Sequence, residues 1–346
     1  MKLFEGQTAD AAWLQAAREL SSDASALQQS RAGLTRELAH VAFEIQDPRQ
    51  RWIISRQPPI NPAFAIAEVV WILAGRNDSA FLNFWNPALP KFAGTGQTYY
   101  GAYGYRLRQQ LEIDQIDRVY QALLHNPDTR QAVLQIWDGR TDLPIDQGKP
   151  ASADIPCNIC SFLKIREGRL EWMQVMRSND LILGLPHNVV QFTSLQEIIA
   201  GWLGLDLGTY HHFSDSLHVY ERNFADLEHA PAVDAPANSD RLDIPREQFD
   251  PVFSEVERRF DELRAGDLDE ARFDELLRLD EMPGGYANFV RIAAADSARR
   301  RGWAERTRTA AEACTNPALR LAWARWMQRQ RDRAEGGASA ASKAGG

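Results

Sequence analysis

The sequence predicts an α+β fold that continues into a set of C-terminal helices. Three observations carry this prediction. Two apolar runs have helical spacing, several short runs have the composition of β-strands, and beyond Glu228 the sequence becomes charged and helix-forming. With 346 residues and 44% hydrophobic content, the chain is long enough to build a large core.

We expect the chain to divide into three segments. Residues 1–230 form the α+β domain, residues 231–335 a helical C-terminal extension, and residues 336–346 a disordered tail. A linker rich in proline and alanine, HAPAVDAPANSD, separates the first two segments. The tail, GGASAASKAGG, has little to bury in a core.

The N-terminal part of the domain supplies the first apolar helix. An amphipathic helix is expected at residues 11–21 and a strand at residues 38–45. Asn61-Pro62 then precedes an apolar helical run that Gly75 ends. Glu68 is the carboxylate inside that run.

The middle of the domain alternates between helices and strands. Residues 86–104, rich in proline, glycine and aromatic side chains, are expected to form a loop before a helix at residues 107–124. A second apolar helix, residues 188–203, ends at Gly204. Strand-like runs occupy residues 132–137, 157–165, 170–177 and 208–220, and a hairpin turn at 166–169 joins the second run to the third.

Composition and charge narrow the class of protein. A formal charge of -8 argues against a general nucleic-acid binder but allows a small anionic substrate. Three cysteines make no disulfide framework, which favours a reducing compartment. The sequence shows neither a signal peptide nor the roughly 20 apolar residues of a membrane helix. A cytoplasmic protein is expected.

Cys157 has several interpretations when it is taken alone. The commonest is a buried structural thiol. With Cys160 it has the spacing of a zinc or redox pair, but no second pair of cysteines or histidines completes a site, so no metal is expected. Cys160 is expected to pack on the opposite face of its strand.

Two polar groups suit chemistry on a phosphorylated substrate. Arg177-Ser178 follows a strand, where a guanidinium group and a hydroxyl could bind phosphate, although a solvated hairpin end is the plainer alternative. Glu68 lies in an apolar helix, where a carboxyl group is suited to proton transfer. It could equally point back to solvent.

Taken together, these motifs resemble the thymidylate synthase and pyrimidine nucleotide (dCMP, dUMP) hydroxymethylase superfamily. The family's Pro-Cys, Arg-Ser-x-Asp-x-x-Leu-Gly-x-Pro-Phe-Asn and Asp-x-His-x-Tyr motifs resemble IPCNICSFLKI, MRSNDLILGLPHN and DSLHVY, in the same order. Upstream, AEVVWILAG, GAYGYRLR and NPDTRQAVLQIWD resemble a helix, a loop and a strand of the family. The resemblance covers about residues 31–223.

The resemblance implies a fold and a reaction. Residues 1–230 would be a thymidylate-synthase-like catalytic domain, a mixed twisted sheet flanked by helices, that works as a homodimer. In the family, a cysteine thiolate adds to C6 of a pyrimidine nucleotide 5′-monophosphate, and C5 then accepts a one-carbon unit from 5,10-methylenetetrahydrofolate.

The resemblance also implies four catalytic residues. Cys157 is the nucleophile, and Arg177 both favours its thiolate form and binds the phosphate. Glu68 matches the general acid/base near C4 and C5. Tyr103 matches the tyrosine implicated in removing the C5 proton, with Tyr100 as an alternative alignment.

Substrate and cofactor residues follow from the same motifs. Asn188 matches the amide that reads O4 and N3, which favours uracil and therefore dUMP, since cytosine-specific members usually carry an aspartate there. The remaining matches are His218 and Tyr220 for the 3′-hydroxyl, Ser178 and Arg31 for the phosphate, Arg130 as an arginine donated by the partner subunit, and Asp180 and Gly184 for the folate.

The sequence also departs from the family pattern. Gln131, Asn158 and His187 replace an arginine, a histidine and a phenylalanine of the motifs. Leu89 and Phe92 stand near the positions of two loop tryptophans, one of which favours methyl formation in the synthases. The chain also lacks the short apolar tail that closes over folate and excludes water. These departures point toward hydroxymethylation.

Three questions stay open at this point. The product could be methyl or hydroxymethyl, and a hydroxymethylase could act on dUMP, UMP, dCMP or CMP. A protein of another class would bind a nucleotide or RNA without catalysis, through arginines after Ala298. Such arginines more often form a solvated, salt-bridged face, and neither a nucleic acid nor a membrane is expected as a partner.

Overall fold

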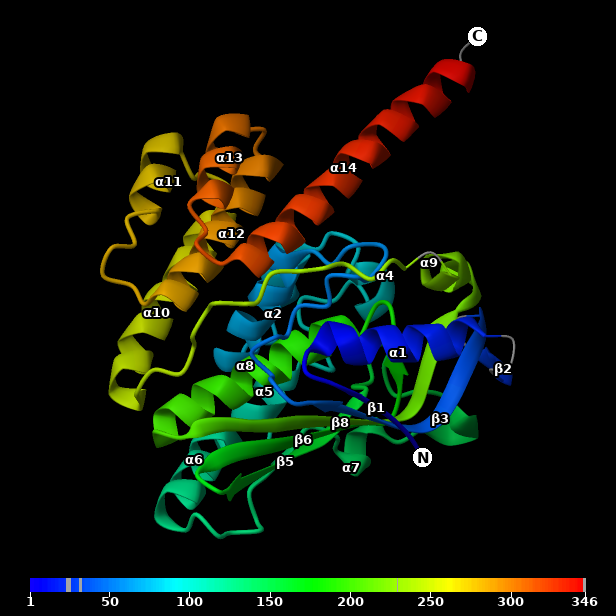
Figure 1. Ribbon diagram of the computed structural model, residues 1–346, viewed down its shortest axis with the longest axis vertical. Helices are drawn as coiled ribbons and strands as arrows, with labels where there is room; N and C mark the ends of the chain where they lie inside the picture. The colour runs from blue at the N-terminus through cyan, green and yellow to red at the C-terminus, as the bar shows by residue number, and fades with distance from the viewer. Residues whose placement is uncertain (23–25, 31–32, 229, 345–346) are drawn as a thin grey trace.

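The computed structural model describes residues 1–344 apart from 23–25, 31–32 and 229. A mixed sheet carries helices on one side, and further helices gather at the C-terminal end (Figure 1). The predicted α+β fold, with its mixed sheet and C-terminal helices, is confirmed. None of the described helices has the length and apolar character needed to span a membrane.

Eight strands of the described chain form the sheet. Its main path runs in the order β1 (Lys2–Gly6), β3 (Gly33–Ile45), β8 (Asp206–Tyr220), β6 (Arg169–Met176), β5 (Asn158–Arg166) and β4 (Val133–Gln135), while β2 (Ala26–Ser30) pairs with β3 and β7 (Asn179–Asp180) with β8. β1 pairs with β3 in parallel, and β6 and β7 each pair with β8 in parallel. The other pairings are antiparallel.

The helices fall into a group around the sheet and a C-terminal group. The first comprises α1 (Ala9–Ser21), α2 (Pro62–Leu73), α3 (Ser79–Trp85), α4 (Pro90–Ala93), α5 (Tyr103–Arg108), α6 (Gln115–His125), α7 (Gly139–Asp142), α8 (Leu185–Leu203) and α9 (Phe224–Glu228). The second comprises α10 (Arg246–Arg264), α11 (Glu270–Leu276), α12 (Gly284–Arg300), α13 (Ala304–Glu312) and α14 (Pro317–Ala344). Nearly all of α8 is buried, which fits its apolar sequence.

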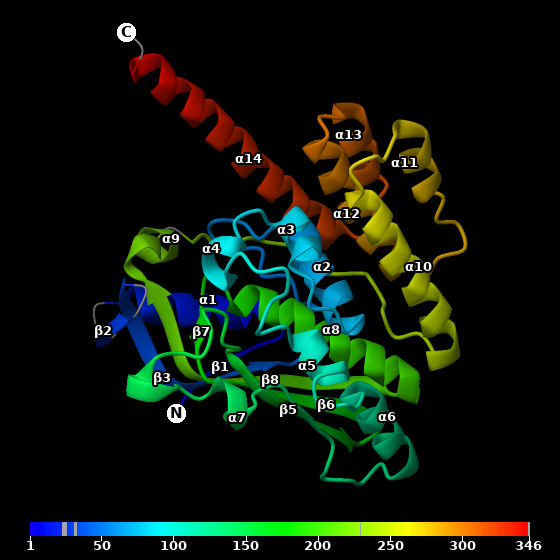
Figure 2. The ribbon, with the colours of Figure 1, turned by 180° about the vertical axis from the view of Figure 1, so that it is seen from behind.

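The two faces of the sheet differ. Helices α1 and α8 pack on the same face (Figures 1 and 2). Leu134 and Leu163 point to that face and are buried. The alternate residues Val133 and Phe162 pair across β4 and β5 and stay 37% and 40% exposed. The opposite face of the sheet therefore presents apolar side chains that no described element covers.

Several local predictions are confirmed by backbone conformation. The hairpin between β5 and β6 turns through Glu167 and Gly168, which have φ angles of 51° and 73°. This left-handed pair matches the twist of the strands on either side. Gly75 and Gly204, at φ 68° and 65°, end α2 and α8 as expected.

The helix predicted at residues 107–124 is wrong, because two helices occupy this stretch. Asp114 accepts a hydrogen bond from the backbone N–H of Asp117 and so caps the start of α6. Arg108, at the end of α5, donates to the same carboxylate at 2.9 and 2.7 Å. The predicted loop at residues 86–104 also contains α4 and the first residues of α5.

The segment predicted as a linker packs against the rest of the chain. The backbone N–H of Val233 donates to the Ser55 hydroxyl at 2.9 Å. The buried side chains of Asn238 and Asp240 both accept from the amide of Asn316, at the start of α14. Residues 230–245 therefore form a strap that fastens the C-terminal helices to the domain.

The C-terminal helices share the core of the sheet domain. Helix α12 is buried over most of its length and packs on α2 and α10. Gly285 permits a close approach, since an added Cβ would lie 2.4 Å from the carbonyl oxygen of Arg241. The sequence did not predict this shared core, because the many charged residues of α10 and α13 dominate its composition. The apolar contacts come mainly from α12.

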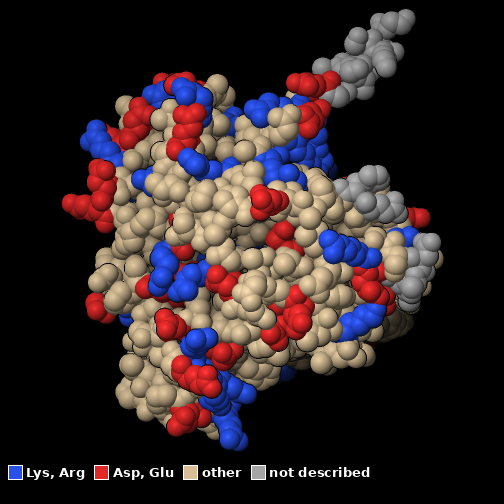
Figure 3. Space-filling model, in the orientation of Figure 1, with Lys and Arg blue, Asp and Glu red and all other residues tan. Residues whose placement is uncertain are grey.

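Charged side chains cover the outer surface of the C-terminal helices (Figure 3). Helices α11 and α13 are joined by ion pairs such as Arg306 with Asp274, which agrees with a salt-bridged face for the arginines after Ala298. Helix α14 continues to Ala344, into the stretch for which composition predicts a disordered tail. The boundaries of the three predicted segments remain a prediction.

Candidate active site

Cys157 and Arg177 meet at one end of two paired strands. Cys157 lies just before β5 and Arg177 just after β6, and the Arg177 backbone N–H donates to the Cys157 carbonyl at 2.9 Å. The Arg177 guanidinium donates to the carbonyls of Pro156, at 3.0 Å, and Ile155, at 3.2 Å. Its side chain therefore holds the segment that carries the thiol.

Cys160 behaves differently from Cys157. It lies on β5, two residues from Phe162 and so on the same side of the strand. Burial raises the pKa of its thiol, which favours the uncharged form. Cys160 is only partly buried on this side, and its expected packing role stays a prediction.

Tyr103 links the four residues predicted as catalytic. Burial raises the pKa of its phenol well above 10, and negative charge at Cys157, Asp154 and Glu68 raises that pKa further, while Arg177 opposes the effect. The side chains must lie close together for these charges to act on one another. Four groups from four separate motifs are thus brought into one cluster.

A glycine sets the position of Tyr103. Gly104 packs directly on α2, where an added Cβ would lie 2.5 Å from the carbonyl oxygen of Ile72. Ile72 is one helical turn beyond Glu68. The contact therefore draws the start of α5 onto the part of α2 that carries the carboxylate.

Glu68 has a close partner that the sequence did not suggest. The Nδ1 atom of His187 lies 2.6 Å from Oε2 of Glu68, and the His187 ring packs on Phe64 with ring centroids 5.0 Å apart. His187 belongs to the first turn of α8. The sequence marked it only as a departure from the family motif, because 119 residues separate it from Glu68.

Asn188 follows on the same helical turn. Its side chain is buried, and its amide donates to Oε1 of Gln191 at 3.2 Å. Gln191, which is also buried, was not predicted as a site residue. The hydrogen bond uses one N–H of the Asn188 amide and leaves its oxygen to accept.

Asp180 and His218 lie opposite each other where β7 pairs with β8. Oδ1 of Asp180 accepts from the backbone N–H groups of Ile182 and Leu183, at 2.7 and 2.8 Å, whereas Oδ2 is buried and has no hydrogen-bond partner among the described residues. Burial raises the pKa of Asp180 and lowers that of His218. Oδ2 is thus an acceptor that a ligand could satisfy.

Tyr220 and Gly184 extend this arrangement. The Tyr220 ring meets the edge of the His218 ring, with centroids 5.2 Å apart. Gly184 caps α8, and an added Cβ there would lie 2.9 Å from Oδ1 of Asn179. The bare backbone at Gly184 is therefore required for the turn that presents Asp180.

The structure does not bring all the residues predicted for the phosphate into one place. Ser178 is half-buried beside Arg177, so these two lie together. Arg130 is exposed before β4. Arg31 lies outside the described residues, and its predicted role stays a prediction.

Asp154 was missed by the sequence reasoning. Its carboxylate accepts from the backbone N–H of Gly101 at 2.8 Å, and burial raises its pKa. Gly101 lies against the Asp154 backbone, where an added Cβ would be 2.8 Å from the carbonyl oxygen. Asp154 thus ties the loop of Tyr103 to the loop of Cys157, and no motif in the sequence marks it.

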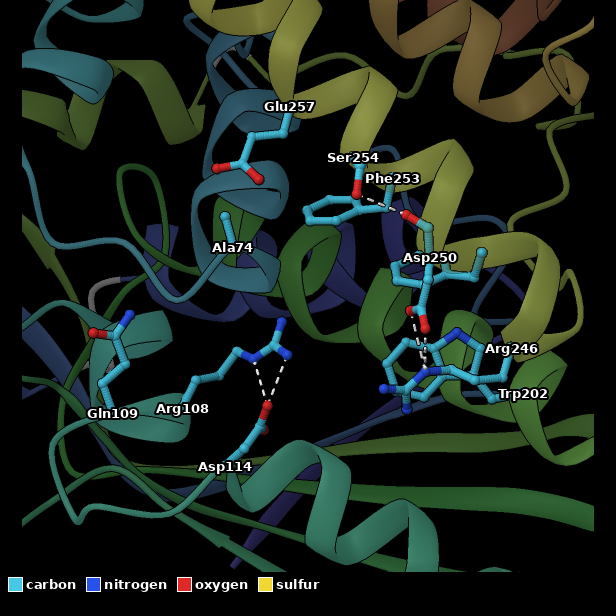
Figure 4. A pocket seen from close by; sticks show the side chains of 11 residues that line it. Ala74, Arg108, Gln109, Asp114, Trp202, Arg246, Asp250, Phe253, Ser254 and Glu257 are labelled. Carbon is cyan, nitrogen blue, oxygen red and sulfur yellow. Dashed lines mark hydrogen bonds and ion pairs between the residues drawn. The ribbon is translucent and has the colours of Figure 1, made fainter.

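A separate cavity of about 430 Å³ opens between α10 and the ends of α2, α5 and α8 (Figure 4). Its two arginines already pair with carboxylates of the lining, Arg108 with Asp114 and Arg246 with Asp250. None of the predicted site residues lines it. It lies apart from the cluster around Cys157.

Comparison with known proteins gives a family. The family model described as thymidylate synthase matches residues 29–263, which extends past the predicted boundary at residue 230. The deoxyuridylate hydroxymethyltransferases of Bacillus phage SP01 and Pseudomonas phage M6 are 37% and 36% identical to the chain. These matches cover 54% and 55% of this chain and 50% and 53% of the phage proteins.

A putative thymidylate synthase of Methanothermobacter marburgensis is 28% identical over 62% of this chain and 92% of its own length. The chain spans about half the length of the phage relatives that it matches. The resemblance drawn from the motifs is confirmed by these matches. The chain belongs to the thymidylate synthase family.

Proposed function

We propose that this protein is an enzyme that transfers a one-carbon unit from 5,10-methylenetetrahydrofolate to C5 of dUMP and releases 5-hydroxymethyl-dUMP. The observation that carries the proposal is the cluster of Cys157, Arg177, Glu68 and Tyr103. A nucleophile, a cation and two proton-handling groups converge there from distant parts of the sequence.

Each member of the cluster has a step to perform. The Cys157 thiolate adds to C6, and the electron pair of the C5–C6 bond moves toward O4, which makes C5 nucleophilic. Arg177 binds the phosphate and holds the Cys157 segment in place. Because burial keeps the Tyr103 phenol protonated, it orients a water that takes the C5 proton instead of acting as a phenolate.

Asn188 supports uracil as the base. Its oxygen accepts from N3–H, and its remaining N–H donates to O4, while Gln191 keeps the amide in one orientation. Cytosine offers an acceptor at N3 and a donor at C4, so it would meet the same two groups with the opposite polarity.

Asp180 supports the folate. The buried Oδ2 atom, which no described residue hydrogen-bonds, can accept N–H groups of a pterin ring. The residues present therefore fit the cosubstrate, whose chemical contribution is the methylene group that becomes bonded to C5. Gly184 holds the turn that presents this carboxylate.

Hydroxymethyl is favoured over methyl as the product by two observations. The phage proteins that resemble the chain are named deoxyuridylate hydroxymethyltransferases. Phe92, near the position of a synthase tryptophan, is 58% exposed. An exposed ring covers little of a site, so water could reach the one-carbon group.

The uncovered face of the sheet supports a homodimer. Val133 and Phe162 continue across the sheet to Met173, so a row of apolar side chains faces outward. Exposed apolar surface of this kind is typical of protein–protein interfaces. Arg130 precedes β4 at this edge, where a partner subunit could receive it. Phe162→Glu should give monomers in light scattering, whereas Leu124→Glu, on α6, should leave dimers intact.

The reaction is tested with dUMP carrying tritium at C5. Release of tritium to water reports removal of the C5 proton, and mass spectrometry then identifies the product. We expect tritium release and a product heavier than dUMP by one CH2O group, with dCMP, UMP and CMP reacting more slowly. A product heavier by CH2 would assign methyl transfer instead, and recovery of unmodified nucleotide from all four substrates would contradict the proposal.

A further inference from the structure

The contact between His187 and Glu68 is the closest side-chain interaction of the proposed general acid/base. Nδ1 of His187 and Oε2 of Glu68 lie 2.6 Å apart, which is a short hydrogen bond. The two side chains are 13% and 17% exposed, so solvent reaches the pair but does not dominate it. Within the part of the chain that the structure describes, no other side chain hydrogen-bonds Glu68.

The pair is built from two elements that the fold brings together. Glu68 projects from the middle of α2, and His187 from the first turn of α8, which packs on α2. Phe64, one helical turn before Glu68, packs against the imidazole ring. The ring is therefore held in one orientation, with Nδ1 directed at the carboxylate.

The neighbour of His187 reads the base. Asn188 comes next on the same turn of α8, so a movement of this turn would shift both residues. Glu68 in turn acts on the charge of Tyr103, together with Cys157. His187 thus joins Glu68 to the turn of α8 that carries the proposed base-reading residue.

We propose that His187 is a positioning residue that directs the Glu68 carboxylate toward the water that completes the hydroxymethyl group. The inference rests on the proposed function and assigns one of its steps to this pair. Phenylalanine, the residue that the family motif carries at this position, could pack on Phe64 but could not hydrogen-bond a carboxylate.

Water addition completes the hydroxymethyl group and releases the Cys157 thiolate. After C5 has gained the one-carbon unit and the folate has departed, the nucleotide carries a methylene group double-bonded to C5 and the Cys157 sulfur on C6. A water oxygen bonds to the methylene carbon, and its proton passes to the Glu68 carboxylate. The electron pair of the C5–CH2 double bond moves toward O4, then returns to form C5=C6 as the C6–S bond breaks and the thiolate leaves.

The test compares two readouts of one reaction under single-turnover conditions. Tritium release from C5 reports the steps before water addition, and the hydroxymethyl product reports the step assigned to the pair. His187→Phe should lower product formation about 100-fold, within the range for loss of general acid–base assistance. Tritium release should fall less than about tenfold, and the KM for dUMP should change less than about threefold.

A conservative variant separates positioning from simple packing. Asparagine places an amide N–H near the position of Nδ1, whereas glutamine reaches the position of Nε2. His187→Asn should therefore recover at least about tenfold of the lost product formation, and His187→Gln less. His125→Asn, on the exposed end of α6, is the matched control and should behave as the unaltered enzyme.

The outcomes are distinguishable. Equal losses of tritium release and product in His187→Phe, or no loss in either, would overturn the inference while leaving the proposed function intact. If that variant fails to fold, the order of the asparagine and glutamine variants decides, and glutamine equal to or better than asparagine overturns the inference. Absence of tritium release from the unaltered enzyme would overturn the proposed function itself.

Discussion

Two carboxylates, one on α8 and one facing it, differ in their partners and in their exposure to solvent. Glu197, in the middle of the helix, is fully buried and pairs with both Arg49 and Arg51. Glu68 faces the first turn of the same helix, where its partner is His187 and its side chain is 17% exposed. One carboxylate is neutralised by two permanent cations and is shut away from solvent. The other keeps a titratable partner and access to water.

We expect Glu197 to contribute to stability and Glu68 to contribute to the proposed reaction. Arg49 also binds Asp243 at 2.9 Å, and Arg51 binds Ser194 at 2.9 Å, so the Glu197 network joins α8 to the strap of residues 230–245. Such a network is costly to break, and its carboxylate is closed off from solvent. A group that must exchange protons needs the arrangement around Glu68 instead.

The largest effect is expected for Cys157, the proposed nucleophile. Cys157→Ala should lower the rate of tritium release by about 10⁴-fold or more, because no other described group can form the C6 bond. The free energy of unfolding should change by less than about 1 kcal/mol, since Cys157 lies before a strand and is only partly buried. A loss of activity shared equally with Cys160→Ala would contradict this assignment.

Glu68→Gln should lower activity by about 10²- to 10⁴-fold, the usual contribution of a general acid or base. Glutamine keeps the size of the side chain and can still hydrogen-bond His187, so the midpoint of urea unfolding should barely move. A variant with normal turnover would show that the carboxylate at this position only packs.

Glu197→Gln should show the reverse pattern. It leaves two arginines without their shared counter-charge, and breaking a buried pair costs about 3–5 kcal/mol of unfolding free energy. Urea titration measures this, and turnover per folded molecule should stay near normal. Glu305→Gln, whose side chain is 74% exposed, is the matched control and should not shift the titration. If Glu197→Gln were as stable as the control, the contrast between the two carboxylates would fail.

The smallest effect concerns pH and the C-terminal helices. Hydrogen bonds from Arg258 and Arg259 lower the pKa of Glu255 to about 2. A lowered pKa in the folded state contributes stability above the ordinary value of about 4.5 and loses it as the pH falls toward 2. Glu255→Gln should therefore flatten the decline in unfolding midpoint between pH 4.5 and pH 2.

Asp180 should change stability with pH in the direction opposite to Glu255. Burial raises its pKa, so its ionisation opposes folding as the pH rises through the folded-state value. Asp180→Asn should remove that loss and stabilise the protein at neutral pH relative to acid pH. A pH dependence of the same sign for both variants would contradict this difference between a buried carboxyl group and one that two arginines hydrogen-bond.

The sequence predicted those parts of the fold that depend on local pattern. The apolar helix with Glu68, the hairpin at Gly168 and the strand that leads to Arg177 all follow from residue type and spacing. The helix at residues 107–124 did not, because Asp114 caps α6 and binds Arg108 across the break, which periodicity alone cannot register.

The parts that were missed depend on contacts between distant residues. His187 contacts Glu68 and Asp154 contacts Gly101, each across a long stretch of chain. The local sequence around His187 and Asp154 does not predict these contacts. The strap at residues 230–245 has the composition of a linker, yet Asn238 is buried by residues that follow it much later in the chain. Composition predicts flexibility only where no such partner exists.

Gly104 has a consequence for how the catalytic distances are set. Tyr103 and Glu68 approach each other because the next residue carries no side chain where it rests on Ile72. A methyl group at Gly104 would collide with the Ile72 carbonyl and would push the start of α5, with the Tyr103 phenol, away from α2 and Glu68. The placement of the Tyr103 side chain therefore depends on Gly104, a residue that has no functional group of its own.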